Sequence, residues 1–458
     1  MAPPVRDLIA TERVRARQRQ ARAEDGALQR LTAGTRRMAG ATGLRQLLTT
    51  GSLALTAAVV ARCLGPHDFG LYAGGTAAFT LCLGFCDFGF GLVLVRELSR
   101  RPQDQVRLMG AGLSAQLGWS TLLSGALAGL GIAAGGTRGL VMMIMAPGVA
   151  FSGLAVSRQI FSVRFRAMPL LVMDISTTLA QCAIMVGLAL AHAPVAALAL
   201  NLCCWTCLCG VLALTLARRQ VGIAVPKRGE IVRFVQTAIP IGVASVLASL
   251  YFSIDLTLLG WLVVAHALGE YAAAVRLLTV VVMIPGFVMA AGIPGLSRSA
   301  GRHEDLSRFA ATLARWIAIT ALPLGVGLAV FARPAVRVLF GPAYLGAVPL
   351  VRILMIAAVL SFASNVSGIT MMSLGIIRPQ IVFNTISLIV NVVGNILLVP
   401  RYGVIASAWL TVASEAIVVS YGLVTLRKRI SYPAIVRGVW RPALAVAIAG
   451  AAGWLLVA

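Results

Sequence analysis

Residues 71–95 have the sequence LYAGGTAAFTLCLGFCDFGFGLVLV, which contains one charged side chain, Asp87. At 1.5 Å per residue, this stretch is long enough as an α-helix to cross the roughly 30 Å hydrocarbon core of a bilayer. Backbone N–H and C=O groups cannot stay unpaired in hydrocarbon, and a helix pairs them internally. The stretch is therefore predicted to be a membrane-spanning helix.

Apolar stretches of this kind recur along all 458 residues of the chain. Hydrophobic residues make up 59% of the sequence and charged residues 12%, whereas a soluble domain is about a quarter charged. We therefore predict an all-α, polytopic membrane helix bundle with about thirteen spans. The predicted spans are approximately 44–63, 71–95, 109–134, 140–161, 170–191, 194–216, 234–264, 271–293, 309–331, 348–374, 381–399, 404–426 and 442–458.

The placement of Lys and Arg tests this assignment, because the net charge is +24 and cytoplasmic loops carry the excess of basic residues. Most basic side chains fall in the even-numbered connections, and few fall in the odd-numbered ones. The even-numbered loops and the basic residues 1–43 are therefore predicted to be cytoplasmic, in a bacterial inner membrane. Because the charge is dispersed between apolar runs, no nucleic-acid partner is expected. The basic tail either contacts anionic membrane lipids or only helps to fix the topology.

All eight cysteines lie in apolar segments or at their ends. Neither disulfides nor zinc-bound thiolates are favoured there, so the cysteines are interpreted as apolar packing residues. We expect no metal and no cofactor.

Two short matches indicate an internal repeat. GLYA at 70–73 opens the second predicted span and GEYA at 269–272 opens the eighth, at an offset of 199 residues. LSR at 98–100 and LSR at 296–298 follow these two spans at an offset of 198. Six spans separate the copies, so both halves enter the membrane in the same orientation. This predicts two parallel six-helix lobes related by an axis along the membrane normal.

The predicted organisation is a basic tail at 1–43, an N-terminal six-helix lobe at 44–216, a cytoplasmic linker at 217–233, a C-terminal six-helix lobe at 234–426, and a basic loop with an additional apolar helix at 427–458. Two lobes around one axis leave a cleft between them. Alternating access follows if the lobes rock against each other.

Ionisable side chains at membrane depth cost several kcal/mol unless they are paired or hydrated, which makes them candidates for function. Asp255 and Arg276 lie on consecutive spans at depths that differ by about 6 Å, counted at 1.5 Å per residue. Either they form a salt bridge, or Arg276 faces the cleft, where its guanidinium group suits a diphosphate.

The remaining polar candidates have two interpretations each. Glu415 lies mid-span without a cation near it in sequence, so it is predicted to couple transport to an ion; a hydrogen bond to a neighbouring helix is the alternative. Asn391 and Asn395 share one helical face at i and i+4, and Asn365 lies in a serine-rich span. They either line a hydrated path or hold helices together. The candidate substrate-binding residues are Arg276, Asp255, Asp87, Asn365, Asn391 and Asn395.

Several motifs carry a family resemblance: ARCLGPHDFGLYA at 61–73, DFG at 87–89, REL at 96–98 and LFGPAY at 339–344. Ordered single positions continue it at Pro240, Asp255, Gly269, Tyr271, Ala274, Arg276, Pro285, Pro294, Asn391, Asn395, Pro400 and Gly403. Over about residues 44–426 the chain resembles polysaccharide and O-antigen flippases of the multidrug, oligosaccharidyl-lipid and polysaccharide exporter (MOP) superfamily.

This resemblance implies two six-helix lobes in a V shape with a cationic cleft. Such a flippase, which is not an enzyme, takes a polyprenyl diphosphate-linked oligosaccharide from the cytoplasmic leaflet and releases it outside. Protons or sodium would be the coupling ion, and the machinery of polysaccharide synthesis would be a partner. Alternatives within the superfamily are a multidrug exporter and a peptidoglycan-precursor flippase. A membrane glycosyltransferase or polymerase is the alternative from another class, and the short outer loops disfavour it.

Overall fold

The structure is a computed structural model that describes residues 48–164, 168–299, 303–374, 376, 378–427 and 429–457. Within these residues all regular elements are helices, which confirms the predicted all-α fold. Helical residues 48–87 lead into α2 (Phe90–Arg100). The longer helices that follow are α3 (Gln105–Ala134), α4 (Gly136–Ser152), α6 (Met168–Leu190), α7 (Val195–Arg218), α8 (Arg228–Leu262), α9 (Ala265–Ser299), α10 (His303–Val330), α12 (Ala347–Ser373), α13 (Arg378–Tyr402), α14 (Val404–Leu426) and α15 (Tyr432–Val457). Short helices between them are η1 (Pro102–Asp104), η2 (Gly153–Arg158), α5 (Gln159–Val163), α11 (Ala332–Leu339) and η3 (Pro342–Tyr344).

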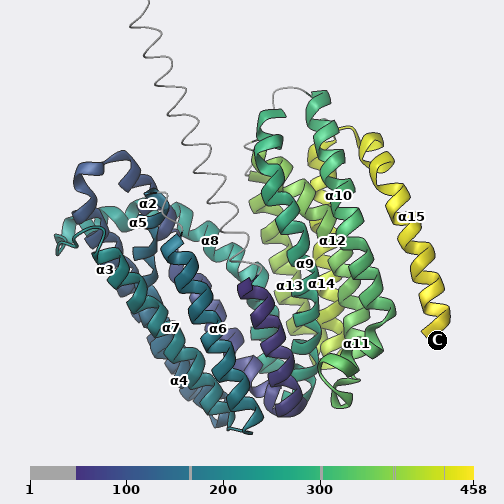
Figure 1. The fold of residues 1–458 in the computed structure, drawn as a ribbon, viewed down its shortest axis with the longest axis horizontal. Coiled ribbons are helices and arrows are strands. Elements are labelled where there is room, and N and C mark those ends of the chain that lie inside the picture. The colour runs from purple at the N-terminus through teal and green to yellow at the C-terminus, as the bar shows by residue number, and fades with distance from the viewer. Residues whose placement is uncertain are drawn as a thin grey trace, which may run out of the picture.

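Twelve helices in the described ranges are long and apolar enough to cross a membrane. The first of them, Leu48–Arg100, has 53 residues. At 1.5 Å per residue such a run would measure about 80 Å, more than twice the bilayer core. Gly65 interrupts it with a left-handed φ of 75°, and the purple segment at the start of the described chain changes direction along its length (Figure 1). Predicted spans 44–63 and 71–95 lie on either side of Gly65, so twelve helices account for the thirteen predicted spans.

Several helices begin earlier than the predicted spans, by six residues at α8, α9 and α10 and by ten at α15. The span predicted at 234–264 is part of α8, which starts at Arg228, and the span predicted at 442–458 is part of α15, which starts at Tyr432. At α8 the backbone N–H of Lys227 donates to the Glu230 carboxylate at 2.9 Å, as in a capping box. Hydropathy marks the apolar part of a helix and misses polar turns that extend it.

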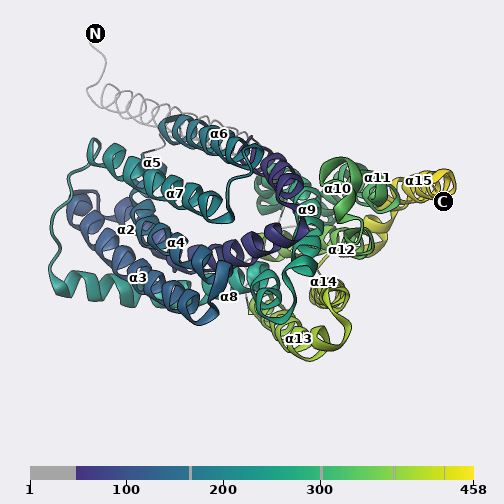
Figure 2. The ribbon, with the colours of Figure 1, turned by 90° about the horizontal axis from the view of Figure 1, so that it is seen from below.

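The helices form two groups (Figure 1). The first helix group contains residues 48–218, where α4 packs against α3 and α7; the second contains α9 to α15, where α12 packs against α9 and α14. Helix α8 contacts both groups: it packs against α2 and α3 and also against α13. Its early half lies on the first group, where the ring of Phe234 stacks on that of Phe90 with centroids 6.0 Å apart. Figure 2 shows α15 at the outer edge of the second group, where it packs against α10.

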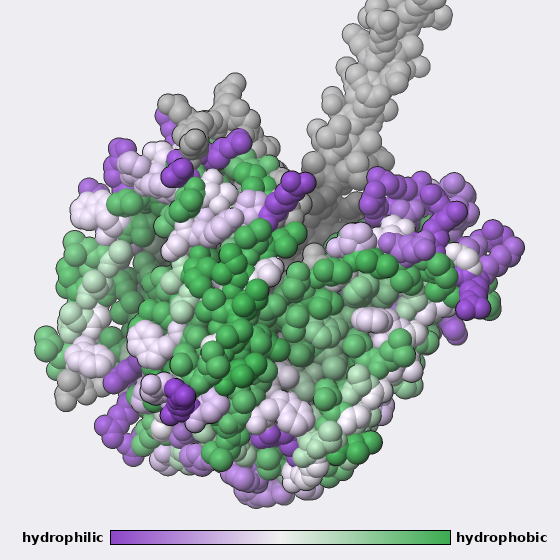
Figure 3. Space-filling view, turned by 180° about the vertical axis from the view of Figure 1, so that it is seen from behind, coloured by the Kyte–Doolittle hydropathy of each residue, from purple (hydrophilic) through white to green (hydrophobic). Residues whose placement is uncertain are grey.

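The two ends of the bundle differ in charge. One end, called the basic end, is where α2, α7 and α14 end and α3 begins, and it holds Arg100, Arg107, Arg164, Arg218 and Arg427. The other, called the opposite end, holds the turns at Gly65, Gly135, His192, Val264 and Gly403. Figure 3 shows a broad apolar band between hydrophilic residues above and below it. A band of this kind is what a bilayer requires of the surface that faces it.

Helix α15 extends along the whole height of the second group. Near the basic end, the Tyr432 hydroxyl donates to the Leu423 carbonyl of α14. Near the opposite end, the Arg352 guanidinium of α12 lies 4.5 Å from the centroid of the Trp454 ring. The last predicted span is therefore a helix fixed at both ends.

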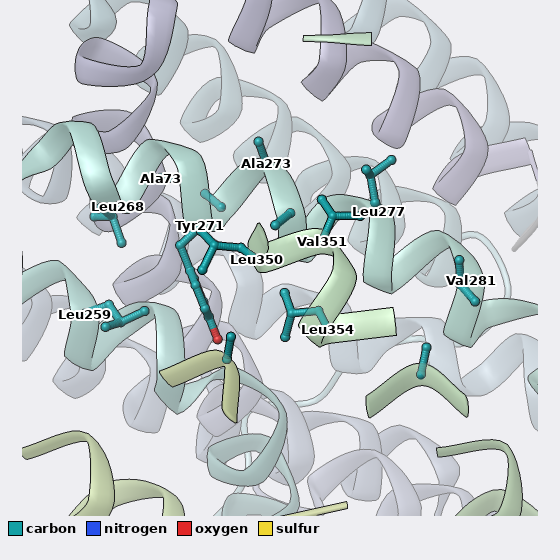
Figure 4. Packing of buried hydrophobic residues seen from close by; sticks show 14 of the residues in the cluster. Ala73, Leu259, Leu268, Tyr271, Ala273, Leu277, Val281, Leu350, Val351 and Leu354 are labelled. Carbon is teal, nitrogen blue, oxygen red and sulfur yellow. The ribbon is translucent and has the colours of Figure 1, made fainter. Parts of the chain in front are cut away.

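The main hydrophobic core joins the two groups. Figure 4 shows Ala73 of the first group among Leu268, Tyr271 and Ala273 of α9, and all four side chains are buried. The packed cluster continues through both groups. The groups are therefore in direct contact around residues 73 and 271.

Candidate functional site

Two acidic side chains face each other across α8 and α14. Glu415 of α14 accepts hydrogen bonds from the hydroxyls of Tyr251, at 3.1 Å, and Ser364, at 3.0 Å. Asp255 of α8 accepts one from the Thr411 hydroxyl at 3.2 Å. Each helix presents a hydroxyl and a carboxylate four residues apart, which places them on one helical face. The two pairs are oriented so that each hydroxyl meets the carboxylate of the other helix.

Two asparagines of α13 extend this arrangement. Asn391 and Asn395 are buried, and the Asn395 amide donates to the Asn391 carbonyl and side-chain oxygens, both at 2.9 Å. Asn391 lies next to the Asp255 carboxylate. On the other side, Tyr271 lies near Asp255 and accepts a hydrogen bond from Ser407 at 3.3 Å. Asp255, Asn391, Asn395 and Glu415 are called the acceptor cluster below.

The acceptor cluster contains oxygens without a donor. Among the described residues, Asp255 Oδ1 and Asn395 Oδ1 are buried and accept no hydrogen bond. A buried acceptor left unpaired costs free energy, and a proton or a cation removes that cost. The chemistry available here is thus the reversible binding of a proton or a small cation.

Arg276 lies elsewhere. It is exposed on α9, near Tyr72 of the first helix group. No ion pair joins it to Asp255 in the described part of the chain, so the salt bridge considered from the sequence does not form. The reason is helical geometry, because five residues separate Arg276 from Tyr271, the side chain that faces Asp255. At 3.6 residues per turn, this separation rotates Arg276 by about 140° away from that face.

Asp87 and Asn365 have local partners. The Asp87 side chain is exposed and accepts from the backbone N–H of Gly91 in the first turn of α2. Just before that turn the chain bends at Phe88 and Gly89, whose φ angles are 34° and 68°. Asn365 donates to the Ser361 carbonyl of its own helix at 2.7 Å. Asp87 therefore caps a helix, while Asn365 lies beside Ser364, a donor to the acceptor cluster.

The structure brings Asp255, Asn391, Asn395 and Glu415 together and leaves Arg276 and Asp87 outside. Tyr251 and Thr411, which donate to the two carboxylates, were not among the predicted site residues. A signal was present, because Tyr251 precedes Asp255 by four residues and Thr411 precedes Glu415 by four. Intramembrane hydroxyls one turn from a carboxylate are natural donors to a neighbouring helix.

A separate apolar cavity of about 820 Å³ lies between α15 and the helices α10, α12 and α14. Its lining is almost entirely aliphatic and aromatic, and Arg427 contributes at the basic end. The cavity has the size and character of a site for hydrocarbon.

Comparison with known proteins defines the class of this fold. The lipid II flippase MurJ, in an inward closed conformation, is similar with a TM-score of 0.72 at 14% identity, over 90% of this chain and 91% of that chain. An inward-facing multidrug resistance MATE transporter of the MOP superfamily gives 0.61 at 13% identity, over 87% and 95%. A eukaryotic MATE transporter gives 0.58 at 13% identity, over 90% and 99%. Sequence comparison with curated proteins gives no significant match.

The fold is thus that of the MOP superfamily of membrane transporters and flippases. A family profile described as "Polysaccharide biosynthesis protein" matches residues 59–349, more than half of the chain. The chain belongs to this family, which confirms the resemblance found in the sequence. It is a multi-pass membrane protein, and its matches are transporters and flippases.

Proposed function

We propose that the protein moves a polyprenyl diphosphate-linked saccharide across the bacterial inner membrane, for the synthesis of exopolysaccharide, capsule or O-antigen. The observation that carries this proposal is Arg276, an arginine within a membrane span of α9 that lies near Tyr72 of the first helix group. A planar guanidinium binds phosphate oxygens with two parallel hydrogen bonds. Family membership supports the saccharide.

The remaining parts of the proposal follow from charge and polarity. The basic end faces the cytoplasm, because cytoplasmic ends carry the excess of Lys and Arg. The acceptor cluster binds the coupling ion, a proton or sodium, because its unpaired oxygens gain a partner on binding. The apolar cavity beside α15 accommodates hydrocarbon of a lipid. Enzymes that build the lipid-linked saccharide are the proposed partners.

The test is transport in reconstituted vesicles. A fluorescent polyprenyl diphosphate saccharide is placed in the bilayer, and an impermeant quencher reports the fraction in the outer leaflet. Arg276→Ala is expected to lower the rate about tenfold or more, because hydrogen bonds to a charged group are lost. Arg276→Lys keeps the positive charge but lacks the planar guanidinium that makes two parallel hydrogen bonds, so this variant is expected to retain part of the transport rate. The control is Arg315→Ala, which removes an exposed arginine of α10. Full transport by both Arg276 variants would contradict the role of this residue.

A multidrug exporter is the second candidate, and the two carboxylates Asp255 and Glu415 favour it because they suit an organic cation. Vesicles loaded with ethidium distinguish the two functions. Ethidium transport that is unaffected by Arg276→Ala, together with no movement of the labelled lipid, would replace the flippase proposal.

A further inference from the structure

Two glycines, one from each copy of the internal repeat, pack against each other at the opposite end. A Cβ atom built on Gly70 would overlap the Ala265 carbonyl oxygen and lie 2.9 Å from the Gly269 nitrogen. One built on Gly269 would overlap the Pro66 carbonyl oxygen and lie 3.1 Å from the Gly70 nitrogen. The obstacles are backbone atoms, which cannot rotate away as a side chain can. Only glycine fits at either position.

These two contacts are copies of one contact. Gly269 follows Gly70 by 199 residues, and Ala265 follows Pro66 by the same 199. The contact of Gly70 with Ala265 therefore maps onto the contact of Gly269 with Pro66. Such reciprocity, in which i meets j and j meets i, is the property of a surface that packs on itself across a two-fold axis. The pseudo-two-fold axis predicted from the repeat thus passes between Gly70 and Gly269.

Other contacts between the two helix groups surround the glycines. The Tyr344 hydroxyl donates to the Ala61 carbonyl at 2.8 Å, and the Arg62 guanidinium donates to the Val338 carbonyl at 3.0 Å. The ring of Tyr344 also meets Phe69 edge to face, with centroids 6.2 Å apart. Burial raises the pKa of Tyr344, which keeps its hydroxyl protonated as a donor. The groups are therefore closed against each other at this end.

Toward the basic end, the same two helices become exposed. In the first group, side chains are buried up to Phe79, and Thr80 and Asp87 are exposed. In α9, Tyr271 to Ala274 are buried, Arg276 and Thr279 are exposed, and Leu277 and Val281 are buried again. Thr279 follows Thr80 by 199 residues, and both are exposed, whereas Arg276 corresponds to the buried Ala77. Arg276 therefore lies on the basic-end side of the glycine contact.

We propose that Gly70 and Gly269 form a self-complementary gate that closes the transport path at the opposite end and must separate for the path to open there. This glycine gate rests on the proposed function in that it supplies one of the two states of alternating access. Because the contact uses backbone atoms on both sides, one added methyl group on either glycine disfavours the closed state and leaves the open state unaffected. By the reciprocity, the two positions have equal effects.

The experiment measures the distance between the groups directly. Spin labels are attached at Ala191→Cys and Tyr402→Cys, two exposed sites at the opposite end, after the eight native cysteines are replaced by Ala. Gly70→Ala and Gly269→Ala are each expected to shift the distance distribution from short to long and to lower the ratio of closed to open states about tenfold or more, as overpacking a rigid contact by a methyl group does. The double variant shifts little further, because both changes break one contact.

Matched controls are Gly187→Ala in α6 and Gly327→Ala in α10, where an added Cβ meets nothing within 4 Å; both keep the parent distribution. Tyr344→Phe is a milder variant for the case that the glycine variants do not fold, and it shifts the distribution in the same direction by a smaller amount. An unchanged distribution in folded Gly70→Ala, or a shift in only one of the two glycine variants, would overturn the gate. A shift without movement of labelled lipid-linked saccharide leaves the gate in place and contradicts the proposed substrate.

Discussion

At the scale of single residues, the most informative group is the pair of carboxylates on α8 and α14. Tyr251 donates to Glu415, and Thr411 donates to Asp255. Each hydroxyl precedes the carboxylate of its own helix by one turn and binds the carboxylate of the other. Movement of α8 along α14 by one turn would break both bonds, because it would place the two hydroxyls or the two carboxylates opposite each other. We therefore expect the ionisation of the two carboxylates to depend on the relative position of the two helices.

Neutral replacements test that link. Glu415→Gln and Asp255→Asn keep the shape of the side chains and remove their charge. We expect each to slow gradient-driven transport about tenfold or more, because an ion loses a charged partner, and to abolish the dependence of the rate on pH or sodium. Rates are measured in vesicles with imposed proton or sodium gradients. Glu230→Gln, outside the acceptor cluster at the start of α8, serves as the control. Unaltered pH and sodium profiles in both variants would exclude coupling at this cluster.

The sequence was sufficient to single out the carboxylates and asparagines but not their partners. Asp255, Asn391, Asn395 and Glu415 were candidates because polar groups in an apolar span are costly. Which of them meet depends on the rotation of the three helices α8, α13 and α14 about their axes. The rotation of α9 also removes Arg276 from Asp255, and sequence distance alone, with the two residues at similar depths, could not show it.

At the scale of helices, α15 is an element attached along one side. It packs against α10, and the cavity separates it from α12 and α14. Two contacts hold its ends, Tyr432 with Leu423 and Trp454 with Arg352. The Trp454 contact should therefore contribute measurably to docking.

Trp454→Ala is expected to lower the free energy of unfolding by about 1 kcal/mol, the usual contribution of a cation–π contact near the membrane surface. Trp454→Phe keeps an aromatic face and loses less. Unfolding is followed in detergent by denaturant titration. Leu455→Ala is the control, because Leu455 is 81% exposed. Equal losses for Trp454→Ala and Leu455→Ala would contradict the docking role.

The positions of the helices could be predicted along their apolar segments, whereas the positions of their ends were predicted less well. The thirteen predicted spans correspond to the twelve long apolar helices of the described residues, but the starts of α8, α9, α10 and α15 were placed too late, because their first turns lie outside the apolar run. At α8 the Glu230 carboxylate accepts from the Lys227 backbone N–H, but a lysine side chain cannot accept the reciprocal bond of a capping box, so the sequence carried no such signal. For the first helical run, Gly65 allowed the chain to turn without a polar loop.

At the scale of the whole molecule, the alternation of charge gives a topology that can be tested. If the basic end is cytoplasmic, α15 ends on the outer side. Alkaline phosphatase fused after residue 458 is then expected to be active, whereas fusion after Arg219 gives an inactive enzyme. Activity of the Arg219 fusion alone would reverse the orientation. The domain boundaries at 216, 233 and 426 stay predictions. The boundary at 233 falls inside α8, which contacts both helix groups.

The repeat was the strongest whole-molecule signal in the sequence. Matches at 70–73 and 269–272 predicted two parallel halves, and the reciprocal contacts of Gly70 and Gly269 now give the position of the axis between them. The sequence did not predict which side of each helix faces the axis. A glycine in a sequence can occupy many environments. Only the structure shows that backbone atoms lie opposite Gly70 and Gly269.

Closure by glycine against backbone has a consequence for how such proteins diversify. The contact between Gly70 and Gly269 is made by backbone atoms, without a side chain that a cargo would recognise. If this contact is the gate and Arg276 binds the cargo, as proposed, sealing the membrane and choosing the cargo depend on different residues. Substitutions at Arg276 are then expected to alter what is carried while the seal stays intact.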